Sequence, residues 1–155
     1  MKLRLPSLHE GVNSLSEKLD AKNFELDKEI FTSPIEIDGE ADYNGQMVDV
    51  RLNIHTSGHF TCFRCAEDFS TELDVETRIV VLARDAEDSN EEESEGLIFI
   101  GTRGTEADLS KEIADAIVLD LPLKILCRPD CKGLCPYCYK DLNAGPCEHS
   151  AELDS

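Results

Sequence analysis

The chain has 155 residues, 41% of them hydrophobic, which suffices for one domain, and its 33 acidic against 15 basic residues give a net charge of −18. That charge disfavours broad binding to nucleic-acid phosphates, and it suits either a basic protein partner or solubility alone. Because the N-terminal segment lacks the apolar stretch of a signal peptide and no run approaches the ~20 apolar residues that span a bilayer, we expect a cytoplasmic protein in a reducing compartment, where cysteines seldom form lasting disulfides.

The first 30 residues give weak signals. Residues 2–5 alternate polar and apolar side chains as an edge strand would, and residues 15–26 are compatible with a short helix or an irregular connection. A clear period-two pattern begins after Pro34 and covers residues 35–41. Asn44-Gly45 then predicts a hairpin turn.

The alternation continues beyond that turn. Residues 47–56 predict a second strand, Ser57-Gly58 predicts a second turn leading into residues 59–63, and a further strand is expected over residues 70–83. These segments together predict an antiparallel meander with short connections.

An acidic segment follows the meander. Residues 85–95 contain seven acidic side chains in eleven positions. Such a run is typical of a solvated loop, and a contact for a basic partner is the alternative.

One helix is predicted near the end of the first 122 residues. A short strand at residues 97–100 and the segment Gly101-Thr-Arg-Gly104 precede it. That segment predicts a strand-to-helix turn, with a clamp on an RNA backbone as the alternative. Thr105 and Asp108 are good helix N-caps, and apolar residues follow helical spacing over residues 108–121 until Pro122 ends the helix.

The strongest chemical signal is the spacing of seven cysteines and one histidine. They form four close pairs, which in chain order are Cys62/Cys65, Cys127/Cys131, Cys135/Cys138 and Cys147/His149. A CxxC turn directs two thiolates at one point, and two such pairs complete a tetrahedral zinc site with distances of ~2.0–2.3 Å. Saturated sites of this kind leave no position for water, so we expect structural and not catalytic metal.

The spacing alone leaves the pairing open. In one arrangement the third and fourth pairs close a site within fifteen residues, and the first pair joins the second, which would connect the β meander to the end of the helix. In the rival arrangement a single zinc ion is held by the two CxxC pairs. We favour two zinc ions because two tetrahedral sites use all eight candidate ligands. Disulfides conflict with the odd cysteine count, whereas an iron–sulfur cluster remains an alternative for four thiolates.

The segment after the helix also has a local excess of basic residues. Residues 124–140 contain four basic side chains, Lys124, Arg128, Lys132 and Lys140. Tyr137 and Tyr139 lie beside cysteines in the same segment. The tyrosines could stack on RNA bases, and packing around zinc is the alternative. No motif marks a catalytic site, so we expect no enzyme activity.

Several segments occur in the order found in a known family. They are Phe31-Thr-Ser-Pro-Ile, the hairpin at Asn44-Gly45, Cys62-Phe-Arg-Cys65 with Phe69, Leu121-Pro122 before Cys127, and Cys131-Lys-Gly-Leu-Cys135-Pro-Tyr-Cys138 with Asp141-Leu-Asn143 and Cys147. In these segments the chain resembles the YceD family, the large ribosomal RNA subunit accumulation proteins.

The chain departs from the family pattern at two positions. Tyr139 stands where the family usually has glycine, which puts the geometry of that turn in doubt, and His149 stands where a last cysteine is common. Imidazole replaces thiolate readily at zinc. Family members without the distal cysteines would keep only the ligands of the first site, which fits pairing Cys62/Cys65 with Cys127/Cys131. The resemblance implies a role in accumulating large-subunit ribosomal RNA and no known catalytic activity.

We therefore predict an α+β fold: a mainly antiparallel sheet that could close into a barrel, one long helix and a C-terminal zinc-binding tail. Residues 1–122 would form the β domain with its helix and acidic loop 85–95, and residues 123–155 the cysteine-rich tail packed on it. The expected function is that of a non-catalytic ribosome-assembly factor. Its zinc-stabilised surface would bind a large-subunit ribosomal protein or precursor rRNA, and no membrane or small-molecule substrate. The alternatives are an rRNA-processing enzyme and a zinc-dependent transcription or translation adaptor.

Overall fold

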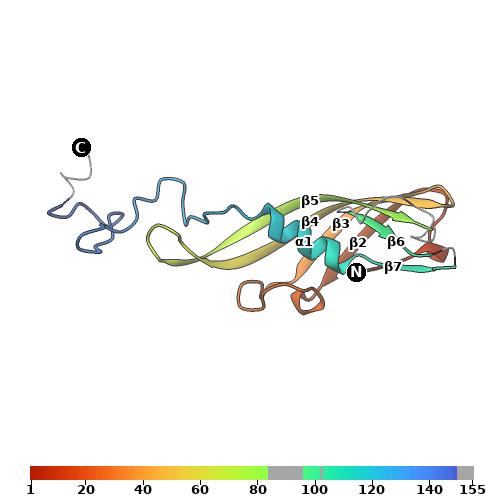
Figure 1. The fold of residues 1–155 in the computed structure, drawn as a ribbon, viewed down its shortest axis with the longest axis horizontal. Helices are drawn as coiled ribbons and strands as arrows, with labels where there is room; N and C mark the ends of the chain where they lie inside the picture. Colours follow the sequence, from red (N-terminus) through yellow and green to blue (C-terminus); the bar gives the residue numbers. More distant parts are fainter. Residues whose placement is uncertain (84–95, 102, 150–155) are drawn as a thin grey trace. The chain divides into compact units, whose positions relative to one another are not determined.

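The computed structural model describes residues 1–83, 96–101 and 103–149, so the predicted acidic loop 85–95 lies outside the described residues. Five strands form the main sheet, in the order β2-β3-β4-β5-β6, and two more form a small sheet (Figure 1). The strands are β1 (Lys2–Arg4), β2 (Gly11–Leu19), β3 (Ile35–Tyr43), β4 (Met47–Thr61), β5 (Asp68–Leu82), β6 (Leu97–Phe99) and β7 (Glu106–Asp108). The described helices are α1 (Ser110–Asp120) and two 3-10 turns, Leu5–Ser7 and Ala21–Asn23. None of these helices has the length and apolarity needed to traverse a bilayer.

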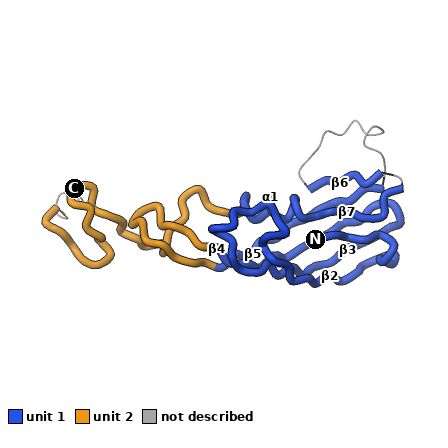
Figure 2. Tube along the Cα trace, turned by 90° about the horizontal axis from the view of Figure 1, so that it is seen from below, with its two compact units in different colours: residues 1–58, 72–120 blue, residues 59–71, 121–155 orange. Residues whose placement is uncertain are grey.

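The chain divides into two compact units, coloured separately in Figure 2. Unit 1 comprises residues 1–58 and 72–120, and unit 2 comprises residues 59–71 and 121–155. Unit 1 contains most of the sheet and α1, whereas unit 2 contains the tip of the β4–β5 hairpin and the cysteine-rich segment. The division at residue 122 that the sequence suggests stays a prediction.

The main sheet is open, and the expectation that it could close into a barrel is wrong. Within the described residues β2 and β6 are its two edges. β3 pairs antiparallel with β4, as the meander predicted, and also with β2, which was not predicted as a strand. β6 pairs parallel with β5, from Val80↔Leu97 to Leu82↔Phe99. A parallel neighbour cannot be reached through a hairpin, so a longer connection separates β5 from β6 in the chain.

β2 covers residues 15–19 of the segment expected to be a short helix or an irregular connection, and the rest of that segment contains the 3-10 turn Ala21–Asn23. It pairs with β3 along all nine of its residues. Its one buried side chain is polar: the Asn13 amide donates to the backbone carbonyls of His9, Gly11 and Ala41. These hydrogen bonds allow a polar side chain to occupy the buried position of β2. The strand therefore lacks the alternation of apolar and polar residues by which a strand is recognised in a sequence.

β4 continues through Ser57-Gly58, where a second turn was predicted, and that prediction is wrong. Alternate residues are buried without interruption along the strand, and Gly58 is one of them. The Ser57 hydroxyl donates to the Ser33 hydroxyl across 2.7 Å. The chain reverses instead after Thr61, in the CxxC turn.

The small sheet pairs the predicted N-terminal edge strand with a strand that the sequence did not reveal. β1 lies antiparallel to β7, with Leu3 opposite Ala107, and both of these side chains are buried. The Gly101–Gly104 turn therefore joins β6 to β7 and not directly to the helix; the Gly104 amide donates to the Gly101 carbonyl.

The core of unit 1 consists of the inward faces of β3, β4, β5 and α1. Residues that are at most 2% exposed there are Ile35, Ile37, Ala41, Val48, Val50, Leu52, Ile54, Ile79, Val81, Leu109, Ile113 and Ile117. The helical spacing of the last three confirms the predicted helix, and burial of each isoleucine contributes roughly 1.5–3 kcal/mol. The Asp108 carboxylate accepts a hydrogen bond from the Ser110 amide at the helix start. Hydrogen bonding to the Ser110 side chain, followed by this backbone bond, lowers the pKa of Asp108.

An exposed charge cluster crosses three strands of the main sheet. His55 on β4 lies between two carboxylates, with Nδ1 2.6 Å from Asp74 Oδ1 on β5 and Nε2 3.4 Å from Asp38 Oδ1 on β3. The hydrogen bond to Asp74 is the main cause of a raised pKa at His55, and the charges of Asp74 and Asp38 add to it.

We expect Asp74→Asn to lower the pKa of His55, as measured by NMR titration. A raised pKa stabilises the fold below the pKa of the unfolded histidine, ~6.5, and this stabilisation is lost as pH rises through the folded-state pKa. The free-energy difference between the original chain and the variant should therefore be larger at pH 5.5 than at pH 8.5 in urea unfolding. In a His55→Gln background the same substitution should show no such pH dependence; if it does, the assignment to His55 is wrong.

Candidate metal centres

All eight predicted ligands lie in unit 2, in two groups of four. The first group is Cys62, Cys65, Cys127 and Cys131, and the second is Cys135, Cys138, Cys147 and His149. Within each group the possible ligand atoms lie within 4.8 Å of one another. The structure thus has the ligand grouping of the two-site arrangement, and it does not bring the first CxxC pair to the second as a single shared ion would require.

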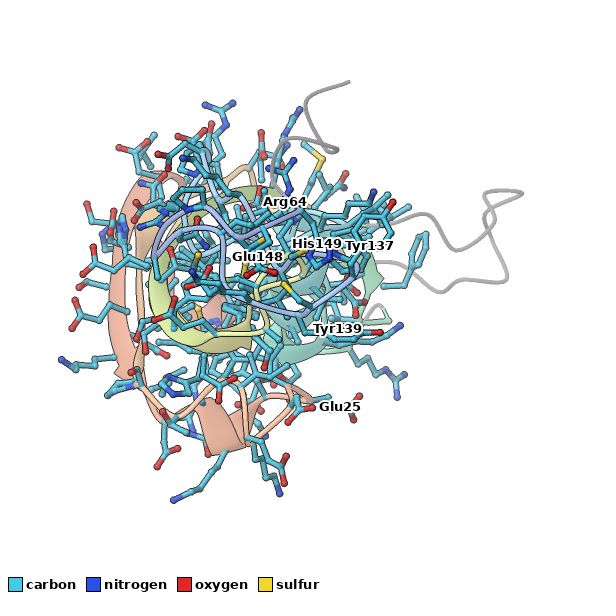
Figure 3. All side chains as sticks on the ribbon, turned by 90° about the vertical axis from the view of Figure 1, so that its left-hand side faces the viewer. Glu25, Arg64, Tyr137, Tyr139, Glu148 and His149 are labelled. Carbon is cyan, nitrogen blue, oxygen red and sulfur yellow. The ribbon has the colours of Figure 1, made fainter. Side chains whose placement is uncertain are left out.

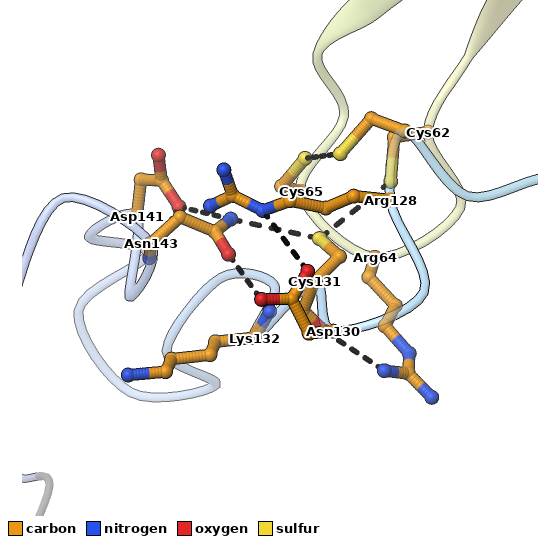
Figure 4. Close-up of polar contacts among 10 residues, drawn as sticks. Cys62, Arg64, Cys65, Arg128, Asp130, Cys131, Lys132, Asp141 and Asn143 are labelled. Atoms are coloured by element: carbon orange, nitrogen blue, oxygen red, sulfur yellow. Dashed lines mark hydrogen bonds and ion pairs between the residues drawn. The ribbon is translucent and has the colours of Figure 1, made fainter.

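The first group has the dimensions of a tetrahedral metal–thiolate site (Figure 4). The Sγ atoms of Cys62 and Cys131 are 3.8 Å apart, and those of Cys65 and Cys127 are 3.7 Å apart. A tetrahedron with zinc–sulfur bonds of ~2.3 Å has edges of ~3.8 Å, whereas a disulfide bond is ~2.05 Å long. All seven cysteines are free, so the donor set of the first group fits a metal ion.

Apolar side chains surround the first group. Cys62, Cys65 and Cys131 are the buried residues of a small cluster, and Phe69, Leu126 and Leu134 pack against them. Four thiols in such a setting leave no ligand position for water, so a metal ion held there would be structural.

The two CxxC turns have the same backbone hydrogen bonds. In the first, the Ala66 amide donates to the Cys62 carbonyl, and the Cys62 amide donates to the Glu67 carbonyl. In the second, the Tyr139 amide donates to the Cys135 carbonyl, and the Cys135 amide donates to the Lys140 carbonyl, at 2.9 Å each. The residue after each second cysteine has a left-handed backbone, with φ 57° at Ala66 and 58° at Tyr139. Tyr139 therefore keeps the turn geometry that a glycine would adopt more easily.

The second group is more exposed and contains the imidazole. Cys135 is buried, Cys138 is exposed, and Cys147 and His149 are half-buried. Nδ1 of His149 is buried and has no hydrogen-bond partner among the described residues. The Tyr137 ring lies 5.3 Å from the imidazole between centroids (Figure 3). A buried nitrogen without a partner is costly unless something accepts its lone pair, and a metal ion would do so.

The thiols of the first group differ in acidity. Burial raises the pKa of Cys62, but hydrogen bonds from the backbone of Cys127, Cys65 and Arg64 outweigh it and bring the pKa to about 6. Burial and the neighbouring sulfurs raise the pKa of Cys127 to about 12. Without a cation, four neighbouring thiols cannot all ionise, because each new thiolate repels the others.

The sequence did not reveal three residues that hold the first group in place. Asn143 donates from Nδ2 to Cys131 Sγ at 3.5 Å and accepts at Oδ1 from the Lys132 amide. Asp141 Oδ1 in turn accepts one hydrogen bond from the backbone N–H of Asn143 and one from its side-chain Nδ2. Arg64 donates to the Cys131 carbonyl at 2.8 Å, and its own carbonyl accepts from the Leu134 amide. The Asp-x-Asn spacing, typical of an Asx turn, is the signal that could have indicated the first two.

The residues considered for RNA contact remain on the surface of unit 2. Tyr137 and Tyr139 are 62% and 74% exposed, and Phe63, which was not among those residues, is 67% exposed. The Lys124 ammonium lies 5.3 Å above the Phe63 ring, in a cation–π contact. Tyr137 packs on His149 and exposes most of its surface, so its stacking on RNA bases stays a prediction.

Comparison with known proteins identifies related chains. A family model described as Large ribosomal RNA subunit accumulation protein YceD matches residues 50–155. An uncharacterized protein of Mycobacterium tuberculosis is 35% identical over 95 residues, which are 60% of this chain and 44% of that protein. One of Mycobacterium leprae is 38% identical over 58 residues, 37% of this chain and 25% of the relative.

A named relative comes from maize. The Large ribosomal RNA subunit accumulation protein YCED homolog 1, chloroplastic, of Zea mays is 50% identical over 38 residues, which are 24% of this chain and 13% of that protein. The chain thus spans less than half the length of the curated relatives it matches. No solved structure matches it.

We expect Ala66→Gly and Tyr139→Gly each to stabilise unit 2 by about 1 kcal/mol, because glycine adopts the left-handed backbone without the steric cost of a Cβ atom. Denaturant unfolding of the metal-loaded chain measures the change. Ala144→Gly is the matched control, since Ala144 is exposed and lacks a positive φ, and it should be neutral or destabilising. Equal stabilisation by all three variants would show that the CxxC turns are not strained.

Metal content separates the two ligand arrangements. Chain isolated under reducing conditions should contain two metal ions, and Cys127→Ser and Cys138→Ser should each reduce the content to one, measured by elemental analysis with a protein assay. A single ion shared by the two CxxC pairs would instead survive Cys127→Ser and be lost in Cys138→Ser. A chain that carries no metal and resists chelators would contradict both arrangements.

Proposed function

Because this chain belongs to the YceD family, we propose that it is a non-catalytic assembly factor that supports accumulation of large-subunit ribosomal RNA. The family match over residues 50–155 is the observation that carries the proposal, since this range includes all eight candidate ligands. The maize relative bears the same description in its name. A cytoplasmic location, where ribosomes are assembled, is part of the proposal.

The proposal assigns one Zn²⁺ ion to each group of four. The first group offers four sulfurs at the spacing of a zinc tetrahedron, and the second offers three sulfurs and an imidazole. Sulfur and imidazole are the ligands of structural zinc, whereas an iron–sulfur cluster is usually held by four cysteines, which the second group lacks. Zinc would neutralise the thiolates and hold together a unit that has few apolar side chains of its own.

Charge separates the two units and bears on the partner. Unit 1 contains 26 of the 33 acidic residues and 10 of the 15 basic residues. Unit 2 contains the remaining seven acidic and five basic residues. An acidic surface attracts basic proteins and repels phosphates. We therefore favour a basic large-subunit ribosomal protein as the direct contact, with the effect on rRNA following from it. Direct contact of precursor rRNA with Phe63, Lys124, Tyr137 and Tyr139 in unit 2 is the second version.

The cellular test replaces metal ligands. In cells that depend on this chain, Cys65→Ser with Cys138→Ser should lower the ratio of large-subunit to small-subunit rRNA. Ser14→Ala with Ser16→Ala, two exposed serines of β2, is the control and should leave the ratio unchanged. The original chain should co-sediment with large-subunit precursors in sucrose gradients. An unchanged rRNA ratio in the ligand variant, at equal protein level, would overturn the proposed role of the metal.

Experiments with purified protein separate the versions and the alternatives. Titration with a basic ribosomal protein and with a precursor rRNA fragment, at several salt concentrations, identifies the direct contact. No RNA binding even at low salt eliminates the second version. Cleavage of the precursor would indicate a processing enzyme, and co-sedimentation with RNA polymerase or with translating ribosomes would indicate an adaptor.

A further inference from the structure

A groove in unit 1 lies between α1 and β5. None of the residues that line it is a candidate metal ligand, because all eight candidate ligands belong to unit 2. Its volume is about 440 Å³, which is in the range of ligand pockets. Ala116, Val118 and Leu119 supply its apolar lining from the last two turns of α1. Val118 is 52% exposed and Leu119 69% exposed, although the opposite face of the same helix is fully buried. These two side chains are the exposed large apolar residues of α1.

The charges around this groove are negative. Glu112 and Asp115 line it, and no ion pair joins either of them to a basic side chain of the described residues. The last turn of α1 contains Asp120 and no basic residue, so nothing on the helix compensates the partial negative charge at its C-terminal end.

The one basic side chain in the lining is already paired. Arg78 donates from Nε and Nη2 to the two oxygens of Asp49 at 2.8 and 2.9 Å, a bidentate contact. This contact lowers the pKa of Asp49, so the carboxylate stays ionised and keeps Arg78 engaged. The groove therefore combines an apolar floor with an excess of negative charge.

We propose that this α1–β5 groove binds a basic amphipathic segment of a protein partner, with large apolar side chains on one face and lysine or arginine on the other. The apolar face would cover Val118 and Leu119, and the cations would meet Glu112, Asp115 and the C-terminal end of α1. Phosphates would be repelled by the same carboxylates, and a second copy of unit 1 would bring its own negative charge to the contact. This inference rests on the proposed function for the identity of the partner, a ribosomal protein.

The test uses the full metal-loaded chain and a synthetic 16-residue peptide with leucine on one helical face and lysine on the other. Glu112→Lys with Asp115→Lys should weaken binding about tenfold or more and reduce its salt dependence, measured by fluorescence anisotropy at three salt concentrations. Val118→Ser with Leu119→Ser should weaken binding about tenfold and leave the salt dependence unchanged. Circular dichroism and denaturant unfolding verify that these exposed substitutions leave the fold intact.

Matched controls separate the groove from general charge attraction. Glu25→Lys with Glu29→Lys makes the same change of net charge at two exposed positions of unit 1 outside the groove and should alter affinity less than threefold. A peptide of equal composition but scrambled pattern should bind at least tenfold more weakly than the amphipathic one. The proposal is overturned if the control variant weakens binding as much as the groove variant, or if both peptides bind alike.

Two further outcomes would also overturn it. If the original chain dimerises in sedimentation velocity and Val118→Ser with Leu119→Ser makes it monomeric, a second copy occupies the groove. If an RNA fragment competes with the peptide and is itself sensitive to the groove variants, the ligand is RNA.

The groove and the proposed function can fail separately. Loss of rRNA accumulation in the ligand variant with no peptide binding at the groove would remove this inference alone. Peptide binding at the groove with a normal rRNA ratio in the groove and ligand variants would keep the docking site and remove the ribosomal role.

Discussion

The mutual approach of four thiols from two distant segments is the constraint on which unit 2 depends. Its apolar cluster is built around Cys62, Cys65 and Cys131, with only a few larger apolar side chains packed against them. Without a cation between them, these buried thiols repel one another once they ionise. Unit 1 has a different basis, since its helix and three strands bury a continuous set of aliphatic side chains. Aliphatic burial therefore holds unit 1 together, whereas unit 2 is organised around its thiols.

Much of this organisation could be predicted from the sequence, because it follows from local periodicity and ligand spacing. The alternating segments gave β3, β4 and β5, and the helical spacing of Leu109, Ile113 and Ile117 gave α1. The number of cysteine pairs favoured two metal sites, but the spacing left their pairing open, and the grouping is known from the structure. The errors arose where side chains met long-range partners: Asn13 makes an inward strand position polar, and Gly58 is accommodated inside a strand. The parallel edge strand and the open sheet depend on the path of the chain, which no local pattern encodes.

The two ligand groups share a segment and therefore influence each other. Asn143 lies between Cys138 and Cys147 in the chain, yet its amide contacts the sulfur of Cys131 in the first group. The isolated bridge between Leu134 and Asp141 draws the same segment together. A disturbance of the second group can thus reach the first through a hydrogen bond that orients one of its sulfurs. Outer partners of this kind commonly affect metal affinity as well as geometry.

The wide separation of Cys62 from Cys131, 69 positions along the chain, has a consequence for biosynthesis. Ribosomes add roughly 5–20 residues per second, so the thiols of the first CxxC turn wait on the order of 3–14 seconds for their partners. The second group closes within a short stretch and can mature as soon as it emerges. A nascent chain therefore passes through a stage at which Cys62 and Cys65 are present without Cys127 and Cys131. At that stage the two thiols are open to oxidants and to competing ions. Translation speed and thiol protection would thereby govern the yield of correctly matured protein.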